Sequence, residues 1–228
     1  YSTDVKWLVP HFEKMLYDNA QLVVAYLEAF QMTGKGDYSR VAREILDYVI
    51  REMTHEQGAF FSATDADSPA PSGHDEEGLF FTWTPSELRE VLGTGDFTIL
   101  IERFYGVTGR GNFEGRSILN VTRPLDSIAR ALDIKLVDAE RLLSEAKTKL
   151  YTKRLERKPP ILDDKVLTSW NGLMISAFAK AGFALGEERY TEAAERAASF
   201  LMKVLWNGAS LKRTWRNGST KYSAYLDD

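Results

Sequence analysis

Residues 19–50 read NAQLVVAYLEAFQMTGKGDYSRVAREILDYVI, and residues 171–202 read NGLMISAFAKAGFALGEERYTEAAERAASFLM. At an offset of 152 positions the two stretches align without a gap, and Asn19 falls on Asn171. Three alanine pairs, a glycine pair, a tyrosine pair and five apolar pairs also match: Ala25/Ala177, Ala29/Ala181, Ala42/Ala194, Gly34/Gly186, Tyr38/Tyr190, Leu22/Met174, Val23/Ile175, Tyr26/Phe178, Tyr48/Phe200 and Val49/Leu201. A repeated helix–turn–helix unit cannot bury its apolar face alone and has to stack on its copies. The repeat therefore predicts helical hairpins around a polar interior that the shared Asn faces.

Each copy is predicted to be a helical hairpin followed by an extended segment. Apolar residues recur every three or four positions from about Pro10 to Met32, which predicts the first helix, and Gly34 is suited to end it. Asp37 is the expected N-cap of the second helix. The second copy is predicted over residues 163–186 and 187–206, with a strand near 210–215.

The residues between the hairpins are predicted to form short strands, loops and helices. Strands are expected over 58–64 and 79–83, an acidic loop over 65–78, and helices near 97–105, 124–131 and 137–154. Thr84 and Glu87 form a capping box, with Pro85 at the first helical position. Hairpins that return at long range with such insertions are typical of an α/α toroid. Residues 1–228 are therefore predicted to be mostly α, as part of an (α/α)6 ring with short β-strand insertions; a helical solenoid is the alternative.

Composition excludes several classes of protein. The 228 residues contain no Cys, which excludes disulfides, thiolate metal sites and thiol catalysis. The 29 basic and 33 acidic residues argue against nucleic acid or an anionic membrane as the main partner. No stretch approaches the roughly 20 apolar residues of a membrane span, and no signal peptide is visible. A cytoplasmic location is the expectation. Because the sequence opens without an initiator Met, we interpret it as a piece of a longer protein.

The first polar cluster surrounds the predicted start of the first helix. On a helix that begins at Pro10, His11 and Asp18 share a face, and Glu13 can touch Tyr17. A histidine and two carboxylates in this arrangement can perform general acid–base catalysis. The structural alternative is helix capping, a surface Glu–Lys pair, and an Asn that bonds neighbouring backbone.

The second polar cluster comprises Asp163, Asp164, Lys165, Trp170 and Asn171. Two acids at a helix start suit the macrodipole, which is a sufficient structural explanation for them. A buried Asn has to be hydrogen-bonded. A Trp beside it offers a flat face with one donor, the type of surface that holds a sugar ring.

The remaining motifs do not match known metal- or nucleotide-binding patterns. The acidic loop does not match the EF-hand spacing, so it is interpreted as a solvated loop or as a rim over the pocket. Residues 111–115 lack the strand-to-helix context of a phosphate loop, which argues against nucleotide binding. The three His are too scattered for zinc, and no metal or cofactor is predicted. Residues 222–228 are expected to start another inner helix.

Together these stretches resemble the YyaL-like, spermatogenesis-associated thioredoxin-domain proteins. The resemblance is carried in order by residues 1–7, 9–22, 66–68, 77–83, 111–119, 163–174 and 224–228. It implies an α/α barrel similar to N-acylglucosamine 2-epimerases and six-hairpin glycosidases, joined to an N-terminal thioredoxin-like domain of the same polypeptide. Residues 68–73 depart from the family pattern by lengthening the acidic loop.

The leading hypothesis is a barrel that binds or modifies a carbohydrate in a central pocket, in an epimerase- or glycosidase-like manner. The candidate catalytic residues are His11, Glu13, Asp18, Asp163 and Asp164, as proton donors or acceptors at a sugar carbon or glycosidic oxygen. The candidate substrate-binding residues are Tyr17, Asn19, Trp83, Asn112, Glu114, Lys165, Trp170, Asn171 and Asp227. The alternative is a non-catalytic scaffold that presents a peptide or partner protein to the thioredoxin-like domain.

Overall fold

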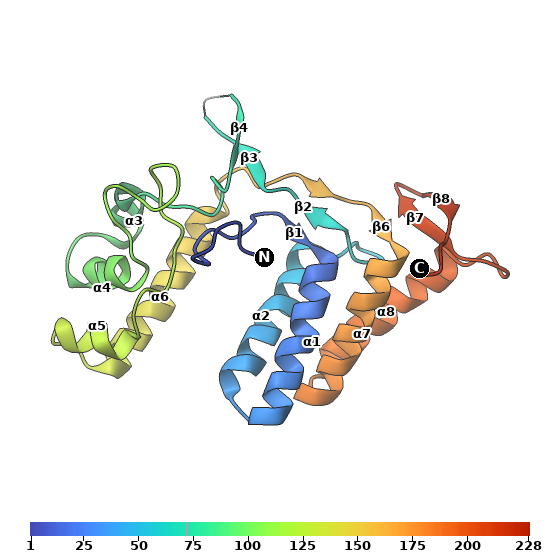
Figure 1. The fold of residues 1–228 in the computed structure, drawn as a ribbon, viewed down its shortest axis with the longest axis horizontal. Helices are drawn as coiled ribbons and strands as arrows, with labels where there is room; N and C mark the ends of the chain where they lie inside the picture. Colours follow the sequence, from blue (N-terminus) through green and yellow to red (C-terminus); the bar gives the residue numbers. More distant parts are fainter. Residues whose placement is uncertain (72) are drawn as a thin grey trace. The chain divides into compact units, whose positions relative to one another are not determined.

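The computed structural model describes residues 1–71 and 73–228; Ser72, in the predicted acidic loop, lies outside the described residues. The chain divides into unit 1, Tyr1–Phe12 with Ala66–Ile161, and unit 2, Glu13–Asp65 with Leu162–Asp228. Within the described ranges it forms eight helices and eight short strands (Figure 1). The prediction of a mostly α protein with short β insertions is therefore confirmed, whereas closure into a ring stays a prediction.

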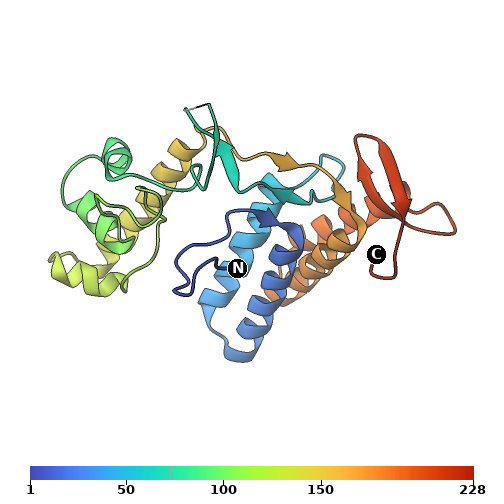
Figure 2. The same cartoon turned by 45° about the horizontal axis from the view of Figure 1, so that its top comes forward.

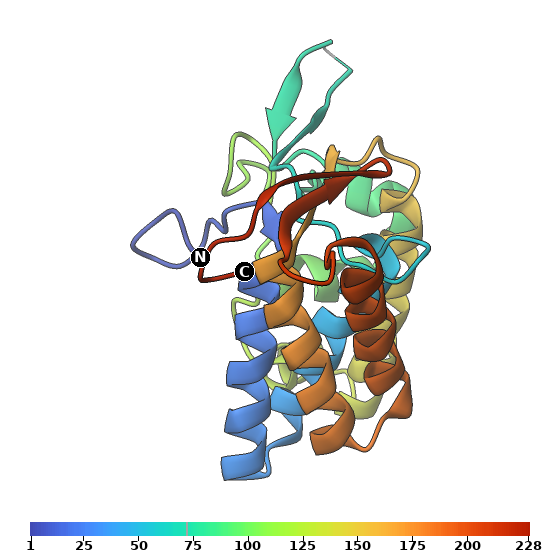
Figure 3. The ribbon, with the colours of Figure 1, turned by 90° about the vertical axis from the view of Figure 1, so that its right-hand side faces the viewer.

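Unit 2 consists of the two predicted hairpins. The first is α1 (Leu16–Thr33) with α2 (Gly36–Glu52), and the second is α7 (Thr168–Leu185) with α8 (Glu188–Val204). Every helix boundary repeats at the offset of 152 positions found in the sequence. α1 packs against α2 and α7, and α7 packs against α8, so the four helices lie side by side over one apolar core (Figure 1, Figure 3).

The aligned glycines end the first helix of each hairpin. Gly34 and Gly186 are the C-caps of α1 and α7, and both have a φ of 67°. Glycine adopts this left-handed conformation at low cost because it has no Cβ. The predicted glycine cap is therefore confirmed. Asp37 is not the N-cap of α2, because Lys35 occupies that position; Asp37 lies in the first helical turn, where its charge suits the helix dipole.

Both first helices begin later than the sequence pattern predicts. α1 begins at Leu16 and not at Pro10, because Phe12 is buried in unit 1 against Phe81 and Phe113. α7 begins at Thr168 and not near residue 163. The residues directly before each helix are extended and pair with distant strands. Their backbone N–H and C=O groups are therefore hydrogen-bonded in the sheets and cannot form another helical turn.

Two small antiparallel sheets lie at the end of unit 2 where α1 and α7 begin (Figure 1, Figure 2). In the first, β2 (Ala63–Thr64) pairs with both β1 (Lys14–Met15) and β5 (Leu162–Asp163). In the second, β7 (Lys212–Arg216) pairs with β6 (Val166–Leu167) and β8 (Ser219–Ser223). The strand predicted near 210–215 is confirmed, and the one predicted over 58–64 is confined to β2. No helix starts within residues 222–228, which end β8 and form a turn.

Unit 1 packs four helices around a second apolar core. These are α3 (Pro85–Leu92), α4 (Asp96–Phe104), α5 (Leu125–Ala131) and α6 (Leu136–Arg154). The only paired strands in its described part are β3 (Asp67–Pro69) and β4 (Asp75–Glu77). The strand predicted over 79–83 is wrong, because these residues form turns and Trp83 pairs with Ser117 in an isolated bridge.

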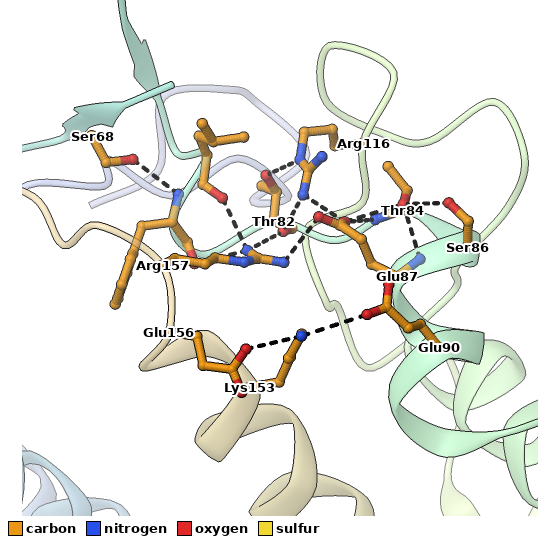
Figure 4. A network of polar contacts seen from close by, with 12 residues as sticks. Ser68, Thr82, Thr84, Ser86, Glu87, Glu90, Arg116, Lys153, Glu156 and Arg157 are labelled. Carbon is orange, nitrogen blue, oxygen red and sulfur yellow. Dashed lines mark hydrogen bonds and ion pairs between the residues drawn. The ribbon is translucent and has the colours of Figure 1, made fainter. Parts of the chain in front are cut away.

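One carboxylate joins three separate segments of unit 1 (Figure 4). Glu87 Oε2 accepts hydrogen bonds from Thr84 N at 2.7 Å and from Arg116 Nη2 at 2.7 Å, and Glu87 N donates to Thr84 Oγ1 at 3.2 Å. Oε1 accepts from Arg157 Nη2 at 3.3 Å. The predicted capping box is thus confirmed, and it is tied to two arginines. Burial raises the pKa of Glu87, but the bonds from Arg116 and Thr84 and the charges of both arginines lower it, and the net shift is downward.

The shared Asn holds the junction between strand and helix in both copies. Asn19 Nδ2 donates to Met15 O at 2.7 Å, and Asn171 Nδ2 donates to Leu167 O at 3.0 Å. Each acceptor belongs to the N-cap residue four positions earlier. Asn171 is fully buried and also bonds both backbone groups of Phe60, accepting from N at 2.8 Å and donating to O at 2.9 Å. Asn171 therefore binds backbone and does not face a polar interior, contrary to the prediction.

Asn171→Ala and Asn19→Ala test whether the two asparagines contribute differently to stability. Asn171→Ala leaves the N–H and C=O of Phe60 without their partner, and we expect a loss of roughly 2–4 kcal/mol in the free energy of unfolding. Asn19→Ala removes one partly exposed hydrogen bond, and we expect a loss of about 1 kcal/mol or less. Urea titration of the full-length protein measures both. Equal losses of unfolding free energy in the two variants would contradict the larger structural role assigned to Asn171.

Glu87 makes unit 1 sensitive to acid. Its pKa in the folded state lies below the ordinary value of 4.5, so its contribution to stability is present above that pH and is lost as the pH falls through the folded-state pKa. We expect Glu87→Gln to be less stable at neutral pH and to lose less further stability on acidification. Acid unfolding followed by circular dichroism measures this, with Glu90→Gln on the same helix as control. Parallel acid profiles for the wild type and Glu87→Gln would refute the prediction.

Candidate functional site

An aromatic pair joins the first turns of α1 and α7. The rings of Tyr17 and Trp170 meet edge to face, with centroids 4.7 Å apart and an interplanar angle of 62°. Both side chains are partly exposed. The two helices run side by side from the same end of unit 2 (Figure 1), so the pair spans the two copies of the repeat at equivalent ends.

Two carboxylate residues lie at the same end of unit 2 as this aromatic pair. Asp18 follows Tyr17 in the first turn of α1. Asp163 is opposite Ala63, which is opposite Met15, so two strand spacings place Asp163 about 10 Å from the residue that precedes α1. Strand pairing therefore brings Asp163 and Asp18, which are far apart in sequence, to the same end of unit 2.

The acids of the second cluster are held in ion pairs and do not start a helix, contrary to the prediction. Asp163 Oδ2 lies 3.1 Å from Lys165 Nζ, and Asp164 Oδ1 pairs with Arg216 Nε on β7. Asp18, by contrast, makes no ion pair within the described residues. Among these acids, Asp18 has the charge most available to a ligand.

A further carboxylate that the sequence did not single out caps α7. Asp228 Oδ1 accepts a hydrogen bond from Ser169 N at 3.2 Å, and Oδ2 accepts from Arg213 Nη1 and Tyr225 N, each at 3.0 Å. Its side chain is fully buried. The predicted neighbour Asp227 is exposed, 3.9 Å from Arg213 Nη1. Only the fold reveals this cap, because Asp228 lies 59 residues from Ser169 in sequence.

The predicted site residues are divided between the two units. His11, Trp83, Asn112 and Glu114 lie in unit 1, and the other predicted site residues lie in unit 2. His11 lies in the extended segment before α1, where it stacks on Tyr1 at 4.7 Å, so the expected helical face shared with Asp18 does not exist. Glu13 likewise precedes β1, so the helical turn expected to bring it to Tyr17 does not exist. A single pocket that contains both groups stays a prediction.

The predicted binding residues of unit 1 occupy structural positions. Trp83 is only 2% exposed, and the Arg157 guanidinium lies over its ring at 4.0 Å, so the indole offers no open face to a sugar. Asn112 uses its amide on the backbone of Ile118, accepting from N at 2.7 Å and donating to O at 3.0 Å. Glu114 is exposed, with a φ of 48°. Their predicted role in binding therefore receives no support from their placement.

The arrangement in unit 2 suits an uncharged polar ligand. The partly exposed aromatic rings offer apolar surface with polar edges, and Asp18 and Asn19 lie one and two residues beyond Tyr17. Within the described residues, no three His, Asp or Glu side chains gather as a metal site requires. In the same residues, no helix combines the length and apolar character of a bilayer span.

No protein-family model matches the chain. Spermatogenesis-associated protein 20 of Homo sapiens is 40% identical over 239 residues, which cover 96% of this chain and 30% of the relative. The Mus musculus protein of that name is 38% identical over 240 residues, with the same two shares. Among solved structures, one titled "Crystal structure of D-mannose isomerase" is 15% identical, covers 90% of this chain and 45% of that chain, and has a TM-score of 0.27. That score is low and does not establish a shared fold.

The chain thus spans less than a third of the length of these curated relatives. The similarity nevertheless extends over almost the whole chain, as the ordered motifs predict. The chain is a homologue of spermatogenesis-associated protein 20.

Proposed function

We propose that unit 2 binds a carbohydrate at the adjacent first turns of α1 and α7. The single observation that supports this is the contact between the partly exposed rings of Tyr17 and Trp170, in the helical turn that also carries Asp18. Aromatic rings bury the apolar faces of a sugar, and carboxylates and amides accept or donate hydrogen bonds to its hydroxyls. In the whole protein this site would belong to an α/α barrel joined to a thioredoxin-like domain, in the cytoplasm.

Asp18 is the acid–base group that we assign to this site, in an epimerase- or glycosidase-like reaction. A catalytic carboxylate has to exchange a proton with its substrate. Asp163 and Asp164 are each held in an ion pair with a cationic side chain, so their carboxylates are less available to a substrate. Asp18 has no such partner within the described residues and follows Tyr17 in the first turn of α1.

The second candidate function is a scaffold without catalysis. Two observations favour it. The side-chain amide of Asn171 makes its hydrogen bonds to backbone groups, and Asp164 and Asp228 form ion pairs with arginines of β7. On this reading the polar residues hold helix and strand ends together. The scaffold would then present a partner protein to the thioredoxin-like domain.

Trp170→Phe tests the carbohydrate site. We expect one or more members of a panel of mono- and disaccharides to bind the full-length protein in calorimetric titration. Trp170→Phe, which loses ring area and the indole donor, should weaken that binding by about 1 kcal/mol. Trp206→Phe, in the same unit and 38% exposed, is the matched control. Binding by no sugar in the panel, or equal effects of the two substitutions, would count decisively against the site.

Asp18→Asn and Asp164→Asn separate the two candidate functions. Each substitution removes one negative charge, near the start of α1 for Asp18 and near the start of α7 for Asp164. We expect Asp18→Asn to abolish turnover or weaken sugar binding with little change in stability. Asp164→Asn breaks a partly exposed ion pair and should cost about 1 kcal/mol or less in the free energy of unfolding, with binding retained. Binding titration and urea unfolding of the same samples measure both. If neither variant changes binding, the scaffold is favoured.

A further inference from the structure

A cavity of about 280 Å³ lies within unit 1, and its lining includes Glu87, Arg116 and Arg157 of the network drawn in Figure 4. Arg116, Arg157, Lys158 and Glu87 provide its charged lining, and Leu79 and Phe80 provide part of its apolar lining. None of the residues predicted from the sequence to bind a ligand lines it. The cavity is therefore distinct from the carbohydrate site proposed in unit 2.

The lining has an excess of positive charge. Three cationic side chains face this cavity with one carboxylate, and that carboxylate is shared by two of them, Arg116 and Arg157. Lys158 is exposed and forms no ion pair with any described residue. A small anion bound in the cavity would supply the negative charge that the lining lacks. It would lie within a few ångströms of the cationic groups, where salt screens their attraction only in part.

The two arginines are fixed before any ligand arrives. Arg157 Nη1 donates to the carbonyl oxygens of Leu79, Phe80 and Thr82, at 3.0, 3.0 and 2.8 Å. Arg116 donates from Nε to Thr82 Oγ1 and from Nη2 to Thr82 O, both at 2.9 Å. Figure 4 shows both side chains converging on Thr82 and Glu87. Because their rotamers are already set, binding an anion here costs little side-chain entropy.

The chemistry of the lining selects an oxyanion with an apolar body. Arg116 Nη1 donates to no described residue and can bind a carboxylate or phosphate oxygen, and the Lys158 ammonium group adds a further point charge. Burial lowers the pKa of the Arg157 guanidinium, while Glu87 acts in the opposite direction, so a further negative charge would favour the charged form. The Leu79 and Phe80 side chains offer apolar surface for the rest of the ligand.

We propose that this cavity of unit 1 binds a small organic oxyanion, a carboxylate or phosphate ester. Its charged end lies at Arg116, Arg157 and Lys158, and its apolar body lies against Leu79 and Phe80. The inference does not rest on the carbohydrate site and stands or falls separately from it.

Calorimetric titration of the full-length protein with four probes tests the ligand class. Benzoate and phenyl phosphate carry both features, inorganic phosphate lacks the apolar body, and benzamide lacks the charge. We expect benzoate or phenyl phosphate to bind, inorganic phosphate to bind more weakly, benzamide not to bind, and added salt to weaken the interaction. Binding of neither aryl anion, equal binding of benzamide, or equal affinity for inorganic phosphate and phenyl phosphate would overturn the proposal.

Lys158→Gln tests the location. Lys158 holds no other described side chain, so the substitution should leave the fold intact and weaken binding of the anion by about fivefold, which is close to 1 kcal/mol. Lys147→Gln on α6, also exposed, is the matched control and should bind as the wild type does. Thermal unfolding of both variants checks that the fold is kept. Equal affinities of the two variants would place the anion elsewhere and overturn the assignment.

Discussion

Unit 2 depends on the pair of hydrogen bonds between the Asn171 side chain and the backbone of Phe60. They join α7 to the segment between α2 and β2 across 111 residues of sequence. Phe60 is itself fully buried, with its ring stacked on Phe178 at 5.1 Å, so no water replaces a lost partner. Because β2 follows three residues later and pairs with both β1 and β5, this contact also sets where α1 begins and where Asp163 lies.

The two copies of the repeat have divergent roles at the same position. Asn171 has its oxygen and both amide protons engaged by Phe60 and Leu167. Asn19 donates to Met15, and within the described residues its oxygen accepts no hydrogen bond. A partly exposed amide oxygen one residue from Asp18 is available to a ligand, whereas the buried amide of Asn171 is not. The identity of the two residues therefore reports a common fold, and only the first copy retains polar capacity for binding.

The helices of unit 2 could be predicted because they depend on local pattern. Apolar periodicity, the Gly34 and Gly186 caps and the fixed offset are all visible in the sequence, and so is the capping box of α3. The short strands could not be predicted, because a two-residue strand shows no periodic pattern and exists only through pairing with distant partners. The contacts of the candidate site could not be predicted for the same reason. The ion pair of Asp164 with Arg216 and the bonds of Arg157 to Leu79 join residues far apart in sequence, and no short motif signals them.

Local charge in unit 1 also departs from what composition indicates. The formal charge of −4 argues against a large polyanionic partner, whose attraction depends on the field of a whole surface. A small anion responds instead to groups within a few ångströms, since at physiological salt more distant exposed charges are screened. At that scale Glu87 is already committed to Thr84 and both arginines, so its presence does not cancel the excess charge of the cavity. A nearly neutral chain can therefore contain a site for a small anion, and the same carboxylate that closes the cap of α3 holds the two guanidinium groups in place for it.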